Sequence, residues 1–136
     1  MNYGHWISEV DFDFSEWFGF VYLITNLTNN RKYIGKKQFS SRNRIKVKGR
    51  KNRKVVITES TWKDYTSSSE ELNQDIIIQG KDKFRFEILK LCKTKRDLGY
   101  TEVKEQFDRN VLEAKLESGE REYYNRNIMS RWFANT

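Results

Sequence analysis

Two tyrosines eleven residues apart are the first candidates for chemistry in this sequence. Tyr22 lies in the apolar run GFVYLIT, and Tyr33 opens the sequence YIGK, which ends with Gly35 and Lys36. A phenol can contact a phosphate or, when cations lower its pKa, take a proton from water. If a hairpin pairs Tyr22 with Tyr33, both phenols lie on one sheet face beside Gly35, where a phosphate backbone could approach. The alternative is that both are ordinary half-buried strand aromatics.

The charge distribution favours a polyanionic partner. Lys and Arg number 26 against 19 Asp and Glu, which gives a net charge of +7. Twelve of these basic residues lie between Arg31 and Lys54, a segment without Asp or Glu. Such a block binds nucleic acid with salt-dependent affinity, although a solvated basic loop would show the same pattern. The residues expected to contact phosphates on an exposed arm are Arg50, Lys51, Arg53 and Lys54.

Length and composition narrow the remaining possibilities. A chain of 136 residues predicts one domain over 1–136, and no apolar run is long enough to span a membrane. No amphipathic helix accompanies the basic block, so membrane binding is not expected. Cys92 is the one cysteine and no secretory signal is visible, which favours a cytoplasmic location. The sequence leaves the oligomeric state open.

Hydrophobic patterning predicts the elements that position these residues. Strands are expected at 20–25 and 31–35, joined by the turn NLTNN, with a further short strand at 54–58 and a central strand at 83–92. Helices are expected at 69–79 and 97–117. The aromatic tail YYNRNIMSRWF should fold back onto the domain.

The order of these features resembles the GIY-YIG nuclease family. The dipeptide VY at 21–22 precedes YIG at 33–35, and basic residues, a glutamate on a later helix and an aromatic-Asn pair follow. The resemblance covers residues 18–128. It implies an α+β fold with a small three-stranded antiparallel sheet flanked by helices, here with a basic insertion at about 45–63. It also implies hydrolysis of DNA phosphodiester bonds with one divalent ion, Mg²⁺ or Mn²⁺.

The resemblance assigns roles to the two tyrosine motifs. It implies that Tyr22 activates water and that Tyr33 contacts the phosphate or a water on the metal. Gly35 and Lys37 would contact the nucleic acid. Lys36 follows the glycine as in the repair members of the family, and its charge would favour a lowered phenol pKa. A solvated lysine is the alternative for Lys36.

The family's arginine and glutamate are assigned less directly. The family's helical arginine falls near Arg42, where its planar guanidinium could bind phosphate oxygens, with Arg44 and Lys37 as alternatives. The metal ligand is expected at Glu102, with Glu105 as second choice, since Mg²⁺ is commonly held by few carboxylates. For either glutamate, the alternative is surface charge near a helix start.

Three further residues complete the assignments. Asn125, in the late Tyr-Asn pair, is expected to hydrogen-bond backbone near the site or to help hold the phosphate, or else to order the tail as a turn residue. Trp62 beside basic residues could contact nucleic acid or anchor the core. His5, the one histidine, is far upstream, so the base is expected to be a tyrosine or a water on the metal.

Three functions are compatible with these features. The leading hypothesis is a metal-dependent DNA endonuclease of the phage type, with a homing or host-DNA-degrading role in the host cytoplasm. The second is a catalytically silent nucleic-acid-binding module on the same scaffold, and the third is a small basic protein that packs on RNA. All three predict salt-sensitive binding, but the first alone predicts turnover.

Overall fold

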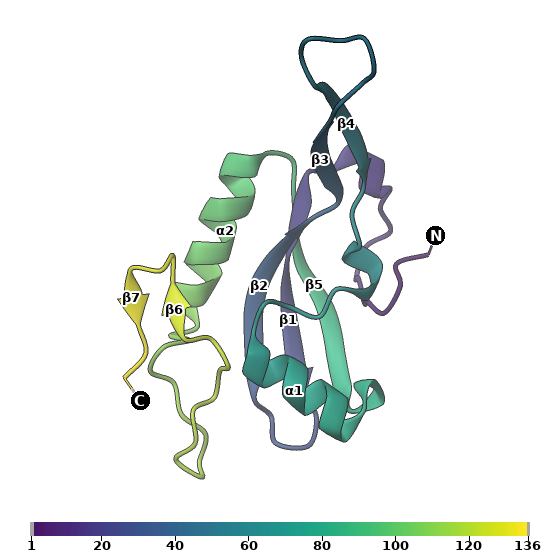
Figure 1. Ribbon diagram of the computed structural model, residues 1–136. Coiled ribbons are helices and arrows are strands. Elements are labelled where there is room, and N and C mark those ends of the chain that lie inside the picture. Colours follow the sequence, from purple (N-terminus) through teal and green to yellow (C-terminus); the bar gives the residue numbers. More distant parts are fainter. Residues whose placement is uncertain (1, 136) are drawn as a thin grey trace.

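A three-stranded antiparallel sheet forms the centre of the computed structural model, which describes residues 2–135 (Figure 1). Its strands are β1 (Gly19–Asn26), β2 (Lys32–Gln38) and β5 (Phe84–Cys92), in the order β2-β1-β5. β1 is the central strand and is buried along its whole length. The prediction of an α+β fold with a three-stranded antiparallel sheet is confirmed. The prediction that 83–92 is the central strand is wrong: β5 lies at an edge and its burial alternates.

The first hairpin forms where the sequence predicts it. β1 and β2 pair in antiparallel register, and the turn between them is held by the Asn26 side chain, which accepts a hydrogen bond from the Thr28 backbone at 3.0 Å. Asn30 adopts a left-handed conformation, which asparagine tolerates better than most residues. The Asn-rich break in the sequence therefore marks a tight turn.

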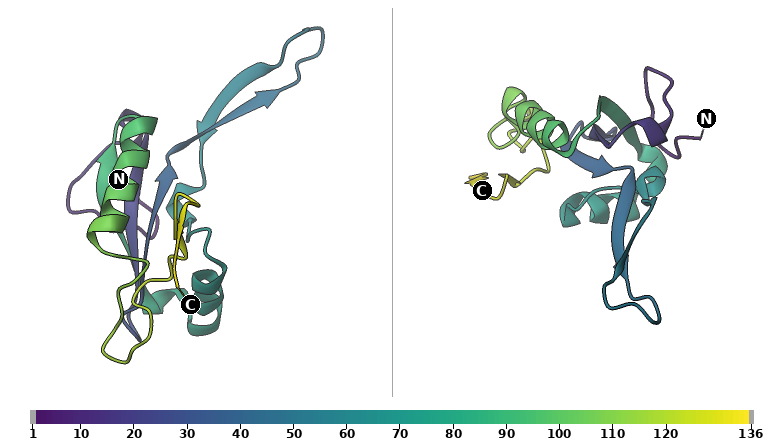
Figure 2. Two further views of the ribbon diagram at one scale, coloured as in Figure 1. Left: turned by 90° about the vertical axis from the view of Figure 1, so that its left-hand side faces the viewer. Right: turned by 90° about the horizontal axis from the view of Figure 1, so that it is seen from above.

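The two helices cover opposite faces of the sheet (Figure 2). On one face, Phe20 and Tyr22 pack with Leu72 of α1 (Glu70–Gln79). On the other, Val21 and Leu23 pack with Leu98 of α2 (Lys95–Asp108). Because successive strand residues point to opposite faces, one apolar run serves both layers.

The helix boundaries agree with the sequence in one case and differ in the other. Ser69 caps α1 by accepting a hydrogen bond from the Leu72 backbone at 3.2 Å, and the helix ends at Gly80, as predicted. The predicted helix over 97–117 is too long, because α2 ends at Asp108 and Asn110 is left-handed. Phe107, near the end of α2, is 49% exposed.

A second hairpin extends away from the sheet (Figure 1). It consists of β3 (Ser40–Ile45) and β4 (Lys54–Glu59), which form a separate two-stranded sheet. The predicted strand at 54–58 is confirmed, but β3 was not expected, because SSRNRI has no apolar alternation to signal a strand. The hairpin begins at residue 40, earlier than the basic insertion predicted at about 45–63.

The remaining elements are short. The tail folds back as predicted, with Tyr123, Tyr124 and Ile128 buried, and forms β6 (Asn127–Ile128) and β7 (Trp132–Phe133). Three 3₁₀ turns occupy Phe14–Glu16, Trp62–Asp64 and Lys81–Lys83. Among residues 2–135, no helix has the length and apolar character needed to cross a membrane.

Candidate active site

The hairpin register decides how the two motif tyrosines meet. Tyr22 pairs with Gly35, and Tyr33 pairs with Ile24, so the predicted direct pairing of the tyrosines is wrong. The two phenols are diagonal neighbours on the same face, as expected, with ring centroids 6.2 Å apart and planes at 30°. Diagonal pairs of aromatic side chains remain within contact distance. The observed register therefore keeps the two tyrosines in contact but places Tyr22, and not Tyr33, opposite Gly35.

Gly35 provides space for the Tyr22 ring. A Cβ added at Gly35 would collide with the Tyr22 hydroxyl, and it would lie 2.6 Å from Tyr22 Cζ and 2.9 Å from Tyr33 Cε1. The space left by the missing side chain, through which a phosphate backbone was expected to approach, is occupied by the Tyr22 phenol. Gly35 lets Tyr22 reach across β2 toward the edge of the sheet.

Glu102 approaches the same edge from α2, on the other face. Its side chain is 19% exposed, and Oε1 lies 3.6 Å from Nζ of Lys36. Lys36 pairs with Val21 and so shares the α2-covered face, whereas Gly35 and Tyr33 belong to the opposite face. The site is thus assembled where the two faces meet at the edge strand β2.

Burial controls the proton affinities in this site. Burial raises the pKa of Glu102, and the charge of Lys36 partly offsets that increase. Burial likewise raises the pKa of Tyr22 well above its usual range, with Tyr33, Tyr65 and the Glu102 carboxylate adding to the increase. The expectation that surrounding cations lower a phenol pKa is not met, because burial and the Glu102 charge raise the pKa of Tyr22, Tyr33 and Tyr65.

Tyr65 is a third phenol of the site, and the sequence did not assign it there. Its ring packs edge-on against Tyr22 at 6.2 Å between centroids, and Nζ of Lys37 lies 4.3 Å above it. A ring nitrogen of His5 lies 2.9 Å from the Tyr65 carbonyl oxygen and holds this backbone. Burial raises the pKa of Tyr65, and Glu102 adds to the effect. The signal available in the sequence was a tyrosine in TWKDYTSSS beside basic residues, which does not indicate that it reaches Tyr22.

Asn125 holds the second motif in place. It is buried, accepts a hydrogen bond from the Ile34 backbone N–H at 3.1 Å and donates one to the Ile34 carbonyl at 2.8 Å. Gln106 of α2 donates to the same carbonyl at 3.2 Å. Of the two site roles expected for Asn125, the structure shows the hydrogen bonds to backbone near the site. These contacts satisfy the open edge of β2 between Tyr33 and Gly35.

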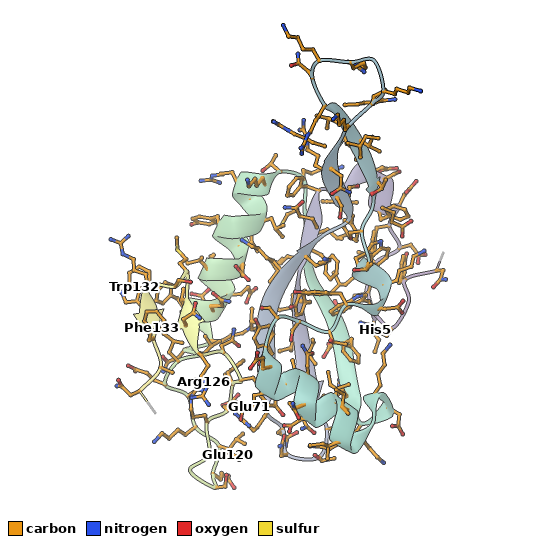
Figure 3. All side chains as sticks on the ribbon, viewed as in Figure 1. His5, Glu71, Glu120, Arg126, Trp132 and Phe133 are labelled. Carbon is orange, nitrogen blue, oxygen red and sulfur yellow. The ribbon has the colours of Figure 1, made fainter. Side chains whose placement is uncertain are left out.

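The other predicted glutamate lies apart from the phenols. Glu105 pairs with Arg109 one turn further along α2, with a distance of 3.1 Å from Arg109 Nε to Oε2. Glu71, on α1, is bound by Arg31 at 3.0 Å and by Arg126 at 3.4 Å (Figure 3). Glu70 and Glu71 line a separate pocket beside Tyr33, whereas the charge of Glu102 raises the pKa of both Tyr22 and Tyr33.

A groove of about 960 Å³ adjoins the site between the sheet edge, α2 and the β3–β4 hairpin. Its lining includes Lys36, Lys37, Arg42, Lys95 and Tyr65, and none of its described lining residues is acidic. The arginine expected on a helix is on a strand here, because β3 follows β2. Among the three candidates for that role, Arg42 and Lys37 line the groove.

Most of the residues predicted to contact nucleic acid lie on the β3–β4 hairpin, but the prediction for Trp62 is wrong. Arg44, Arg50, Lys51, Arg53 and Lys54 are all exposed on the hairpin or its loop. Trp62 is completely buried between Phe39 and Phe14, where it packs at 4.9 Å and 5.6 Å between ring centroids. Its indole is therefore a core anchor, since its ring cannot contact DNA without unfolding the domain.

The residues of the site fit a hard cation held by few protein ligands. Within residues 2–135, no group of three or more His, Cys, Asp or Glu side chains is placed to bind a metal. Glu102 supplies a partly buried carboxylate whose pKa is raised by burial although Lys36 lies 3.6 Å away. Its charge also contributes to the raised pKa of Tyr22, Tyr33 and Tyr65. Mg²⁺ is commonly bound by one or two carboxylates, with the rest of its shell from water and substrate phosphate.

The fold and the site together define a nuclease domain of the GIY-YIG type. The model of a protein family described as "Putative endonuclease segE, GIY-YIG domain" matches residues 5–128, and the chain belongs to this family. Comparisons with curated proteins and with solved structures found no match.

Proposed function

We propose that the protein is a divalent-metal-dependent endonuclease that hydrolyses DNA phosphodiester bonds at the edge of β2. The observation that carries the proposal is the position of Glu102, which is partly buried beside Lys36 and close enough to Tyr22, Tyr33 and Tyr65 to raise their pKa. A buried carboxylate costs folding free energy unless it binds something, which is typical of a functional site. The family to which the chain belongs supports a nuclease.

The surrounding side chains have complementary roles in this proposal. The groove cations Lys37, Arg42 and Lys95 draw the DNA backbone in, and Arg42 binds oxygens of the scissile phosphate as negative charge develops there. Tyr33, which is less buried than Tyr22, contacts the phosphate through its hydroxyl. Tyr22 and Tyr65 orient the attacking water. Asn125 fixes the backbone of Ile34, which lies between Tyr33 and Gly35.

Glu102 is the residue that would hold Mg²⁺ or Mn²⁺. When bound, such an ion supplies Lewis-acid polarisation of the phosphate and lowers the pKa of water. In the reaction, the water oxygen bonds to phosphorus as one sugar ester bond breaks, and the proton lost by water balances the one gained by the leaving oxygen. Because burial keeps the phenols protonated at neutral pH, their role in this proposal is to donate hydrogen bonds.

The test is cleavage of supercoiled plasmid by the purified chain with Mg²⁺ and with EDTA. We expect Mg²⁺-dependent cleavage, and a loss of about tenfold to a thousandfold in rate for Tyr33→Phe, which removes one hydroxyl and keeps the ring. Tyr100→Phe is the matched control, because Tyr100 is 58% exposed on α2 and its hydroxyl has no role in the proposed site. Cleavage that EDTA leaves unchanged would contradict the proposal.

A catalytically silent DNA-binding module is the second candidate. It is favoured by one observation, namely that burial raises the pKa of all three site tyrosines, so none is an effective base near neutral pH. It predicts the same salt-dependent binding without cleavage under any metal condition. A homing or host-DNA-degrading role for a phage-type enzyme in the host cytoplasm is part of the leading proposal and depends on cleavage.

A further inference from the structure

The β3–β4 hairpin, residues 40–59, is a ribbon with both faces open to solvent. Each strand has six residues, which corresponds to about 20 Å at roughly 3.4 Å per residue. The views in Figure 2 show it reaching well beyond the sheet and helices. Its base is attached by hydrogen bonds from Ser60 to the carbonyls of Phe39, at 2.8 Å, and Gln38, at 2.6 Å. A two-stranded ribbon without a core is only marginally stable alone, so its extension needs another explanation.

Charge gives the hairpin an affinity for a polyanion. It carries eight Lys or Arg residues and one acidic residue, Glu59, which lies at its base and pairs with Lys63 at 3.6 Å. Figure 3 shows side-chain nitrogen atoms gathered along the hairpin and its tip. The basic loop residues at the tip are suited to binding phosphates, because binding to the DNA backbone requires only positive charge.

One face of the ribbon has a composition that phosphate binding does not explain. Register places Arg42 opposite Ile57 and Arg44 opposite Val55, so these four side chains share a face. Ile57 is 65% exposed and Val55 is 40% exposed, although both are aliphatic. Because Arg42 and Ile57 also line the groove, this face continues from the active site outward.

Arginine and aliphatic side chains together match the base edges of the DNA major groove. Arginine binds O6 and N7 of guanine, aliphatic groups contact the thymine methyl, and the groove, about 12 Å wide, admits a two-stranded ribbon. Residues 40–59 include no aromatic side chain on which unpaired bases could stack. The major groove of an RNA duplex is too narrow for side chains to read. These properties favour a B-form DNA duplex over single strands or RNA.

We infer that the β3–β4 hairpin enters the major groove of double-stranded DNA and that Arg44, Val55 and Ile57 read base edges there. This inference rests on the proposed function for the position of the scissile phosphate, but base reading itself requires no cleavage. The ribbon thereby supplies sequence preference to a nuclease domain whose groove cations recognise only the backbone. The expected discrimination per direct base contact is about fivefold to a hundredfold.

The test is binding by the full chain in EDTA, where metal-dependent cleavage does not occur. A pool of DNA duplexes with a randomised centre is selected for binding, and the enriched duplex is then probed with dimethyl sulfate, which methylates guanine N7 in the major groove. We expect an enriched motif with protected guanine N7. Arg44→Ala should remove that protection, and Val55→Ser with Ile57→Ser, which removes every aliphatic methyl at these positions, should change the motif. The control is Ile45→Ser on the opposite face, which should preserve both.

Each outcome decides the inference independently of catalysis. Absence of an enriched motif, protection of adenine N3 in the minor groove instead, or an unchanged motif in the Val55 and Ile57 variant would overturn it. Equal binding of single-stranded DNA or of an RNA duplex of matched length would also overturn it. A protein that protects guanine N7 in EDTA but never cleaves plasmid with Mg²⁺ would support the ribbon and refute the nuclease.

Discussion

Replacement of Glu102 by glutamine should stabilise the metal-free protein while abolishing its activity. The substitution keeps the shape of the side chain and removes its charge. Burial raises the pKa of Glu102, which means that the fold disfavours its ionised form. For an acid, a raised folded-state pKa is a cost to stability at every pH above that pKa, so neutral glutamine removes the cost at pH 7.

The expected magnitudes follow from the surroundings of Glu102. Its partner Lys36 is 48% exposed, so the lost ion pair is worth at most about 1 kcal/mol. A single stabilising substitution commonly raises the free energy of unfolding by about 0.5 to 2 kcal/mol, and we expect Glu102→Gln to fall within this range. For the wild-type chain, Mg²⁺ at 100 times its Kd should add about 2.7 kcal/mol, and the variant should lose this increment. Cleavage should fall at least about a thousandfold, or roughly 4 kcal/mol.

Urea unfolding with EDTA or MgCl₂, together with plasmid cleavage, measures these effects. Glu105→Gln is the matched control, because it removes a carboxylate three residues away that is paired with Arg109. It should cost at most about 1 kcal/mol, keep the Mg²⁺ increment and keep cleavage. The reasoning is refuted if Glu102→Gln is less stable than wild type in EDTA, retains the increment, or cleaves at the wild-type rate.

Two further predictions concern charge. Four basic residues lie near the hairpin tip, namely Arg50, Lys51, Arg53 and Lys54. Neutralising them should weaken binding similarly on unrelated DNA sequences and reduce the slope of log affinity against log salt by up to roughly 3.6. Binding titrations at several salt concentrations measure this slope, and an unchanged slope would contradict phosphate contacts at the tip. Burial, with the charge of Lys81, lowers the pKa of His5 from 6.5 to about 4, so the stability that neutral His5 contributes is present above pH 6.5 and is lost as the pH falls toward 4. The loss, measured by urea unfolding, should be at most about 3.4 kcal/mol, at about 1.36 kcal/mol for each pKa unit. His5→Gln should flatten this pH dependence, and an unchanged pH dependence in that variant would contradict the assignment to His5.

The sequence by itself determined the local features of the fold. The first hairpin follows from the Asn-rich turn between two apolar runs, and α1 follows from Ser69 and Gly80 at its ends. Both depend on residues close together in the chain, where turn chemistry and helix capping act. The spacing of the two tyrosines and the position of Glu102 on a helix were likewise readable, because they depend on order along the sequence.

Tertiary structure decided which of these residues meet. Pairing of Tyr22 with Gly35 gives the glycine a different role from the one predicted, because register depends on the packing of a whole strand. Tyr65 reaches the site through a connection that has no periodic pattern, and Asn125 reaches Ile34 from 91 residues away. β3 escaped prediction because a strand exposed on both faces carries no hydrophobic alternation, and the early end of α2 at Asp108 results from a left-handed asparagine. The site therefore depends on long-range packing, which local propensity does not encode. The sequence identifies several of its residues but does not show which of them lie together.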